Sequence, residues 1–250
     1  MPTPPYLDRI FLKEGGIHDE SKFPFSLPFV RELDLTFDSE VCFLVGENGS
    51  GKSTVIEAIA QLCRLPVGGG GRNDLADGNS PHKESELAPA LLGSFFIKPK
   101  DGYFFRAEFQ AHFASLLDER AEDPDFLGDP YGRYGGSSLH GLSHGEAFLS
   151  VFKSWMREGM ILMDEPESAL SPQRQLSLLA MMSELVQQGG AQLIIATHSP
   201  ILLTFPGASI FNFVDGELKK VTLEETEHYQ ITKGILDDPY RYWRHLERPE

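Results

Sequence analysis

Positive charge, cysteine and long apolar runs are all scarce in this chain of 250 residues. Lysine and arginine total 22 against 37 aspartates and glutamates, which gives a formal net charge of −15 at pH 7. A chain this acidic does not coat nucleic acid by bulk attraction, although a local basic patch or a DNA-binding partner stays open. No apolar run approaches the roughly 20 residues that span a bilayer, so we do not expect a membrane channel.

The two cysteines, Cys42 and Cys63, lie in or beside apolar segments. Such thiols suit buried packing better than a disulfide or a metal site, which predicts a reducing, cytoplasmic setting. Met1–Arg9 has no apolar core of the signal-peptide kind. The sequence shows no internal repeat, and it shows no long heptad segment, which excludes a full coiled-coil arm. The length leaves room for one large domain or two small ones.

A glycine-rich turn is the strongest feature that the sequence does have. It follows the apolar run 41–45 and precedes residues 55–62, whose apolar positions have helical spacing. It reads G-x-x-x-x-G-K-[ST], the phosphate-binding loop, in which backbone N–H groups and a helix dipole cradle phosphates. Lys52 can reach the β- and γ-phosphates, and Ser53 can offer its hydroxyl to Mg²⁺. The nucleotide-binding candidates are Gly46, Glu47, Asn48, Gly49, Ser50, Gly51, Lys52, Ser53 and Thr54.

Two later apolar strands also end in polar side chains. Residues 160–163 lead into Asp164 and Glu165, and residues 191–197 lead into His198. We expect Asp164 to hold Mg²⁺ together with Ser53, and Glu165 to be the general base that deprotonates the attacking water. His198 could bond the γ-phosphate and position the water, since ligands of open α/β sheets bind at the carboxyl ends of strands. Asp164 and Glu165 could instead be solvated acids at a strand end without a functional role. The presence of a phosphate-binding loop in the same chain disfavours this alternative.

A second anion site is predicted at the start of the helix expected over residues 143–158. The segment Leu142-Ser143-His144-Gly145-Glu146 opens this helix. Ser143 and Gly145 would leave a bare helix N-terminus, rich in N–H donors, for a phosphate. One chain cannot easily bring both anion sites to one phosphate, whereas two chains arranged head to tail could.

The remaining segments predict an antiparallel layer at the N-terminus and several helices. Strands are expected over residues 6–13 and 30–37. Two further strands, 209–214 and 217–222, are expected to form a hairpin. Residues 91–97 and 103–105 flank a turn and predict a second hairpin. Further helices are expected over residues 108–120, 171–188 and 226–246, the last broken at Pro239.

Two segments carry open alternatives. Residues 66–86 are rich in small polar residues and predict a mobile loop, with Gly68 to Gly71 interpreted as linker rather than as a second phosphate cradle. The proline-rich segment 23–29 predicts irregular structure. Its Phe25 or Phe29 could stack on a nucleotide base, although plain core packing is favoured.

Together these motifs resemble the ABC-type ATPase domain, in order and in approximate spacing across nearly the whole chain. Ser143 and Gly145 match the serine and second glycine of its L-S-G-G-Q signature, while His144 and Glu146 replace the first glycine and the glutamine. Residues 168–171 match the D-loop, with Ser171 where aspartate is usual, and His198 matches the switch histidine. The resemblance implies two ATP molecules, each held between the phosphate-binding loop of one subunit and the signature turn of another.

One departure concerns the Q-loop, which couples transporter ATPases to their membrane subunits. No glutamine stands at a strand end after the first helix, since Gln110 lies inside a predicted helix and Arg106 and Glu108 lie nearer the hairpin. The Asp-Glu-Pro-Glu run and the signature segment look more like stand-alone, SMC-like ATPases of the AAA group.

The expected fold is α/β, with a mostly parallel P-loop NTPase core of ABC type and an N-terminal antiparallel β layer. One domain would cover residues 1–250, with about 66–158 as an inserted helical subdomain carrying the signature. The expected function is Mg²⁺-dependent ATP hydrolysis driving a homodimer that acts on an unidentified protein partner, in DNA repair or defence. Nucleic acid stays possible, and no direct membrane insertion is expected. The alternatives are the ATP-binding subunit of a membrane transporter and a nucleotide-gated binding module with little turnover.

Overall fold

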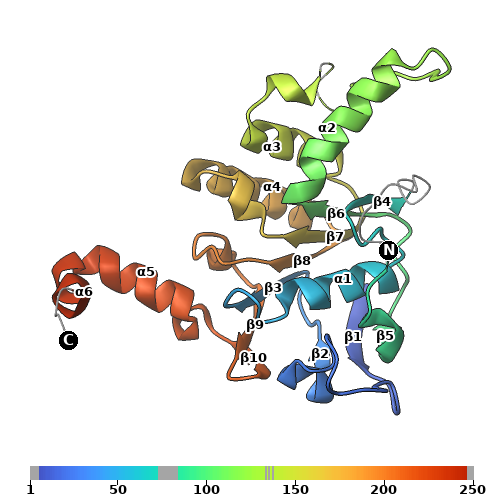
Figure 1. The fold of residues 1–250 in the computed structure, drawn as a ribbon. Coiled ribbons are helices and arrows are strands. Elements are labelled where there is room, and N and C mark those ends of the chain that lie inside the picture. The colour runs from blue at the N-terminus through green and yellow to red at the C-terminus, as the bar shows by residue number, and fades with distance from the viewer. Residues whose placement is uncertain (1–5, 73–83, 133, 135, 137, 247–250) are drawn as a thin grey trace.

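A seven-stranded, mostly parallel sheet forms the centre of the molecule, in the order β10-β9-β3-β8-β7-β6-β4 (Figure 1). The computed structural model describes residues 6–72, 84–132, 134, 136 and 138–246, without the side chains of 107–112, 116 and 245–246. Parallel pairs join β9 to β3, β3 to β8, β8 to β7 and β7 to β6, and only β10 and β4 at the two edges are antiparallel. The strands are β3 (Val41–Gly46), β4 (Gly70–Gly71), β6 (Gly102–Arg106), β7 (Gly159–Asp164), β8 (Ala191–Ala196), β9 (Ser209–Val214) and β10 (Glu217–Val221).

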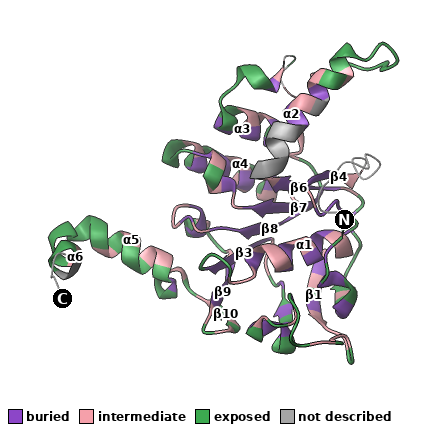
Figure 2. Ribbon diagram, viewed as in Figure 1, coloured by how far each residue is buried: buried purple, intermediate pink, exposed green. Residues whose placement is uncertain are grey.

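Both faces of this sheet are buried, because side chains alternate along each central strand. In β3, Cys42 and Leu44 enter one apolar core, while Phe43 and Val45 enter the other. Helix α1 (Lys52–Leu62) packs in the first core. Helices α2 (Ala107–Glu122), α3 (His144–Ser154) and α4 (Pro172–Gln188) cover the opposite face (Figure 1). The buried strands and the exposed outer helices are distinguished in Figure 2.

A small antiparallel sheet lies against α1 and confirms the predicted N-terminal β layer. Its order is β2-β1-β5, with β1 at Leu7–Leu12, β2 at Asp34–Thr36 and β5 at Leu91–Phe95. Gln192 of β8 ties this sheet to the core. Its Oε1 accepts from the N–H of Leu7 at 2.9 Å, and its Nε2 donates to the carbonyl of Leu7 at 3.0 Å.

Three sequence predictions are wrong in this region. The hairpin expected over 91–97 and 103–105 does not form, because β5 pairs with β1 while β6 pairs with β7 in the other sheet. The strand expected over 30–37 is shortened to β2, since the 3₁₀ helix η1 (Pro28–Glu32) takes its first residues. Gly70 and Gly71 are a buried edge strand rather than linker, and a Cβ on Gly71 would meet Trp155 Cη2 at 2.8 Å. Residues 73–83 of the predicted loop lie outside the described residues.

The C-terminal part follows the prediction more closely. The hairpin β9–β10 forms, and α5 (Glu227–Asp237) and α6 (Pro239–Leu246) project from the body of the molecule (Figure 1). Within the described ranges, no helix has the length and apolar character needed to cross a membrane. Further 3₁₀ helices among the described residues are η3 (Ala88–Ala90), η4 (Leu139–Gly141), η5 (Pro166–Ala169), η6 (Leu202–Thr204) and η7 (Leu223–Glu225).

Candidate functional site

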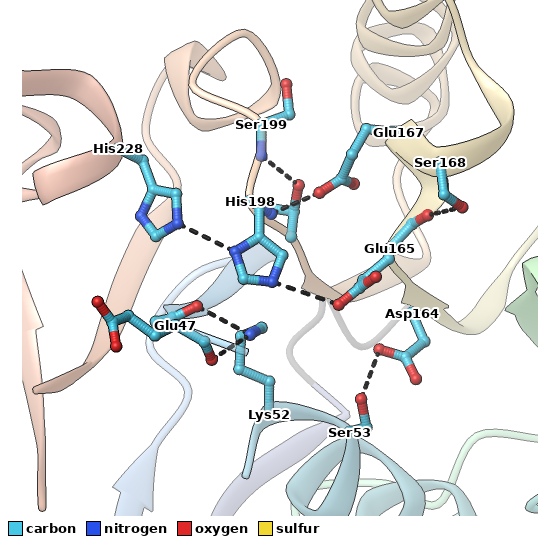
Figure 3. Close-up of polar contacts among 12 residues, drawn as sticks. Glu47, Lys52, Ser53, Asp164, Glu165, Glu167, Ser168, His198, Ser199 and His228 are labelled. Atoms are coloured by element: carbon cyan, nitrogen blue, oxygen red, sulfur yellow. Dashed lines mark hydrogen bonds and ion pairs between the residues drawn. The ribbon is translucent and has the colours of Figure 1, made fainter. Parts of the chain in front are cut away.

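The phosphate-binding loop connects the carboxyl end of β3 to the first turn of α1, as its mechanism requires. Gly51 takes a left-handed backbone with φ 104°, and a Cβ there would meet Phe29 Cε1 at 2.6 Å. Lys52 is buried, and its ammonium donates to the carbonyl oxygens of Gly46 at 2.8 Å and Glu47 at 2.9 Å (Figure 3). Burial lowers the pKa of Lys52, while the carboxylates of Glu165 and Asp164 oppose that shift.

One of the two proposed base-stacking aromatics, Phe29, is held in the core. Phe29 is only 4% exposed and meets Phe213 edge to face, with ring centroids 5.0 Å apart. Phe25 packs against the same core. Core packing, the favoured alternative, is therefore confirmed for Phe29, whereas Phe25 is only partly buried. Phe23, an exposed side chain that no sequence pattern marked, also borders the loop.

The two predicted metal ligands meet across the sheet edge. Ser53 Oγ donates to Asp164 Oδ1 at 3.2 Å. Desolvation raises the pKa of Asp164 to about 6, although the nearby guanidinium of Arg106 favours the ionised form. The described residues contain no cluster of three or more His, Cys, Asp or Glu side chains suited to a metal. A hydroxyl and one carboxylate fit Mg²⁺, which takes few protein ligands and completes its shell with phosphate oxygens and water.

Glu165 and His198 converge beside this pair (Figure 3). The carboxylate oxygen Oε1 of Glu165 lies 3.3 Å from His198 Nε2. Glu165 has a left-handed backbone with φ 49°, a conformation that is costly for a residue with a side chain and is concentrated at functional sites. His198 Nε2 is buried, and among the described residues it has no aligned hydrogen-bond partner. Burial and the charge of Lys52 lower the pKa of His198, which keeps its imidazole neutral near pH 7.

Three neighbours of these side chains were missed by sequence reasoning. His228, from the first turn of α5, places its Nε2 3.0 Å from His198 Nδ1. Half-buried Glu167 accepts a hydrogen bond from the backbone N–H of His198. Arg106 ends β6 and lies 2.8 Å from Glu57 Oε1 and 3.5 Å from Asp164 Oδ2. Glu167 could have been found in the Asp-Glu-Pro-Glu run, whereas no local pattern marks His228.

The predicted signature turn opens α3, but its N-terminus is not bare. Ser143 is the N-cap, and the Glu146 carboxylate accepts from its N–H at 2.9 Å and from its hydroxyl at 2.7 Å. Glu146 also pairs with Arg174 at 2.9 Å. Gly145 is buried, and a Cβ there would meet Arg174 Cδ at 2.7 Å. The expectation of a bare N-terminus is therefore wrong, because Glu146 at the third helical position completes a capping box.

Two hollows meet at the phosphate-binding loop, one on each side of Asn48 and Gly49. The first, of about 340 Å³, includes Phe23, Lys52 and Glu165. The second, of about 440 Å³, is bordered by Pro28 and Phe29, by the β9–β10 turn and by His228. The P-loop, Asp164, Glu165 and His198 are thus gathered at one edge of the sheet. Ser143 and Gly145 stand instead at the start of α3, where Gly145 is next to Ala169 and Arg174.

The chain is similar to ATP-binding proteins of known families. It is 26% identical over 256 residues to a protein of Pyrococcus furiosus named as a putative ABC transporter ATP-binding protein, covering 88% of this chain and 93% of that one. It is 28% identical over 179 residues to the cytochrome c biogenesis ATP-binding export protein CcmA of Rhodopseudomonas palustris, covering 66% and 81%.

Among solved structures, an SMC head bound to the C-terminal winged-helix domain of ScpA shares the fold. Its TM-score is 0.51 at 14% identity, with 88% of this chain and 99% of that chain covered. Residues 41–126 and 147–204, more than half of the chain, match the family described as "AAA domain, putative AbiEii toxin, Type IV TA system". The chain belongs to this AAA family and is an ABC-type P-loop ATPase domain.

Proposed function

We propose that this chain binds Mg·ATP at the edge formed by the phosphate-binding loop and hydrolyses it. The observation that supports this most directly is the convergence of two pairs, Ser53 with Asp164 and Glu165 with His198, beside Lys52 (Figure 3). One pair supplies oxygen ligands for a divalent cation, and the other supplies a base beside a neutral imidazole. Phosphoryl transfer to water requires these two functions and a phosphate cradle.

Each residue has a distinct task in this proposal. Lys52 leaves the loop carbonyls that it contacts here and binds the β- and γ-phosphate oxygens. Glu165 accepts a proton from the attacking water, and its contact with His198 fixes the carboxylate beside the γ-phosphate. His198 Nε2 holds the γ-phosphate or the water. Mg²⁺, when bound through Ser53 and Asp164, neutralises charge on the phosphates.

We also propose that two copies associate head to tail around ATP. The loop that would bind the nucleotide and the turn carrying Ser143 and Gly145 lie on different layers of one chain (Figure 1). A second copy would bring its own α3 N-terminus to the γ-phosphate. In this arrangement the chain acts as one domain, with residues from about 66 to 158 inserted to carry the signature turn.

We prefer the hypothesis that the chain is a stand-alone, SMC-like ATPase in the cytoplasm. It would act on a protein partner in DNA repair or in defence. The end of β6, where a transporter ATPase would present its coupling glutamine, carries Arg106 instead, and this side chain turns inward to Glu57 and Asp164. The second candidate is the ATP-binding subunit of a membrane transporter. It is favoured by the transporter names of the relatives.

ATP hydrolysis by the purified chain, measured as phosphate release with and without Mg²⁺, tests the proposal. We expect Mg²⁺-dependent turnover that Lys52→Ala abolishes and Glu165→Gln lowers by about 10²–10⁴-fold. Turnover equal to that of Lys52→Ala would refute hydrolysis. Co-purification of a membrane subunit would favour the transporter reading, and stimulation by DNA would favour the SMC-like reading.

A further inference from the structure

The side chain of Arg106 points from the end of β6 toward Asp164, the proposed metal ligand at the end of β7. The two strands are parallel neighbours, and their register places Arg106 directly beside Asp164 (Figure 1). The guanidinium nitrogen Nη2 lies 3.5 Å from Asp164 Oδ2, and the two side chains are only 12% and 8% exposed. Because water screens such an enclosed pair little, Arg106 acts directly on the orientation of this carboxylate.

The guanidinium of Arg106 is itself held by contacts outside the metal site. Its other terminal nitrogen, Nη1, lies 2.8 Å from Glu57 Oε1 on α1 and donates to the carbonyl oxygen of Val67 at 3.1 Å. Its carbon Cζ lies 5.6 Å from the ring centroid of Phe104, within the range of a cation–π contact. These three contacts come from separate segments of the chain, so they fix the position from which Nη2 reaches Asp164.

The two carboxylate oxygens of Asp164 face different partners. Ser53 Oγ donates to Oδ1 at 3.2 Å, whereas Oδ2 faces Arg106. Glu57 is the nearer partner of Arg106 and offsets part of its positive charge. A cation bound between Ser53 and Asp164 would therefore meet a carboxylate that is already held through its other oxygen.

We propose that Arg106 positions Asp164 for the divalent cation of the nucleotide site. This inference rests on the proposed binding of Mg·ATP. A side chain that holds a metal ligand fixes the orientation of that ligand, and its loss commonly weakens metal binding by about 10- to 100-fold. Arg106 is a positioning residue here, since it acts on the cation through Asp164. Arginine suits this task because its planar fork contacts two carboxylates at once, which the single ammonium of lysine does not match.

A purely structural role for Arg106 makes a different prediction. If Arg106 only neutralised the half-buried Glu57, its removal would lower the stability of the fold without changing how nucleotide binding depends on the metal. A positioning role changes the dependence of nucleotide binding on Mg²⁺ concentration. Metal titrations therefore separate the two roles.

The test measures binding of a fluorescent ATP analogue to the full chain, across a Mg²⁺ titration and in EDTA. Arg106→Met removes the guanidinium and keeps an unbranched stem, while Arg106→Lys keeps the positive charge but loses the fork. The matched control is Arg72→Met. Arg72 is also partly enclosed, and it donates to the carbonyls of Cys63 and Pro99 at the far end of α1 from the phosphate-binding loop. Thermal unfolding reports the stability of each variant.

We expect Arg106→Met to raise the Mg²⁺ concentration for half-maximal nucleotide binding about ten-fold, with affinity in EDTA changed by less than about three-fold. Arg106→Lys should raise it about three-fold, and Arg72→Met should lower stability alone. Saturating Mg²⁺ should return the hydrolysis rate of Arg106→Met to within about three-fold of the wild-type rate, because Ser53 and Asp164 themselves remain.

Four results would overturn the inference. A wild-type dependence on Mg²⁺ in both Arg106 variants refutes the positioning role and leaves the binding of Mg·ATP intact. A stronger response to Mg²⁺ in Arg106→Met refutes it as well, since the guanidinium would then repel the cation. If the wild type binds the nucleotide equally in Mg²⁺ and in EDTA, the proposed metal site fails and the inference fails with it. If Arg106→Met does not fold, Arg106→Lys decides, and a Mg²⁺ dependence equal to that of the wild type refutes the inference.

Discussion

His228 Nε2 lies 3.0 Å from His198 Nδ1, so a residue of α5 contacts the histidine that borders Glu165. One of the two facing nitrogens must carry a hydrogen and the other must not. Burial and the charge of Lys52 lower the pKa of both imidazoles, which keeps the pair neutral near pH 7. The contact therefore fixes the orientation of His198 while leaving its Nε2 toward Glu165.

We predict that His228→Ala lowers kcat about 10- to 100-fold with little change in KM, because His198 loses the contact that orients its ring. His228→Gln should restore most of kcat, since an amide can bond Nδ1. Charge on His228 lowers the pKa of His198, so both variants should raise that pKa and move the acid limb of the rate profile to higher pH. Equal kcat in the wild type and the alanine variant would exclude a positioning role.

Much of this site follows from local sequence, because its parts stand at strand ends. The phosphate-binding loop, Asp164, Glu165 and His198 each terminate an apolar run, and parallel strands bring their carboxyl ends together. His228 could not be found in this way. It comes from a helix with no motif, and its position depends on how the β9–β10 hairpin directs the chain back to the loop.

The errors in the predicted fold have a similar cause. Two apolar runs around a turn indicate strands but do not identify their partners, so β5 and β6 were expected to pair although they join different sheets. The signature turn shows the limit for side chains. Ser143 and Gly145 indicate an anion site in the sequence. Glu146 is equally visible there, but whether its carboxylate caps the helix depends on its side-chain rotamer, which the sequence does not determine.

The capping carboxylate of Glu146 gives a second prediction, in the Glu165→Gln background with Mg·ATP. Glu146→Gln should tighten the ATP-bound dimer about two- to five-fold, because a neutral amide can keep the cap while removing negative charge from the helix N-terminus. Glu146→Ala is the comparison, since it removes the cap and the Arg174 contact as well as the charge. An unchanged dimer dissociation constant for Glu146→Gln would mean that no phosphate approaches this turn.

The pKa of Asp164 gives a third prediction, for metal dependence. Burial raises this pKa from 3.8 to about 6, so the carboxylate is ionised above pH 6 and protonated below it. Mg²⁺-dependent ATP affinity should therefore fall as pH decreases from 7.5 to 5.5, by up to about ten-fold per pH unit below the pKa. The Asp164→Asn variant should bind Mg·ATP weakly at both pH 7.5 and pH 5.5. Any pH dependence that it keeps comes from titration of the nucleotide itself and is subtracted from the wild-type profile. Parallel profiles for both proteins would show that Asp164 does not bind the metal.

Gln192 supports a fourth prediction, on stability. Its amide satisfies both the N–H and the carbonyl of Leu7, and both residues are fully buried. Gln192→Leu preserves approximate size but leaves these two backbone groups without partners, so the free energy of unfolding should fall by about 2–4 kcal/mol. Gln188→Leu, an exposed change on α4 where the amide bonds only Glu184, should change it by less than about 0.5 kcal/mol. Urea unfolding of the two variants measures the difference. If both lose the same small amount, the small sheet is held by its apolar contacts with α1 rather than by the Gln192 link.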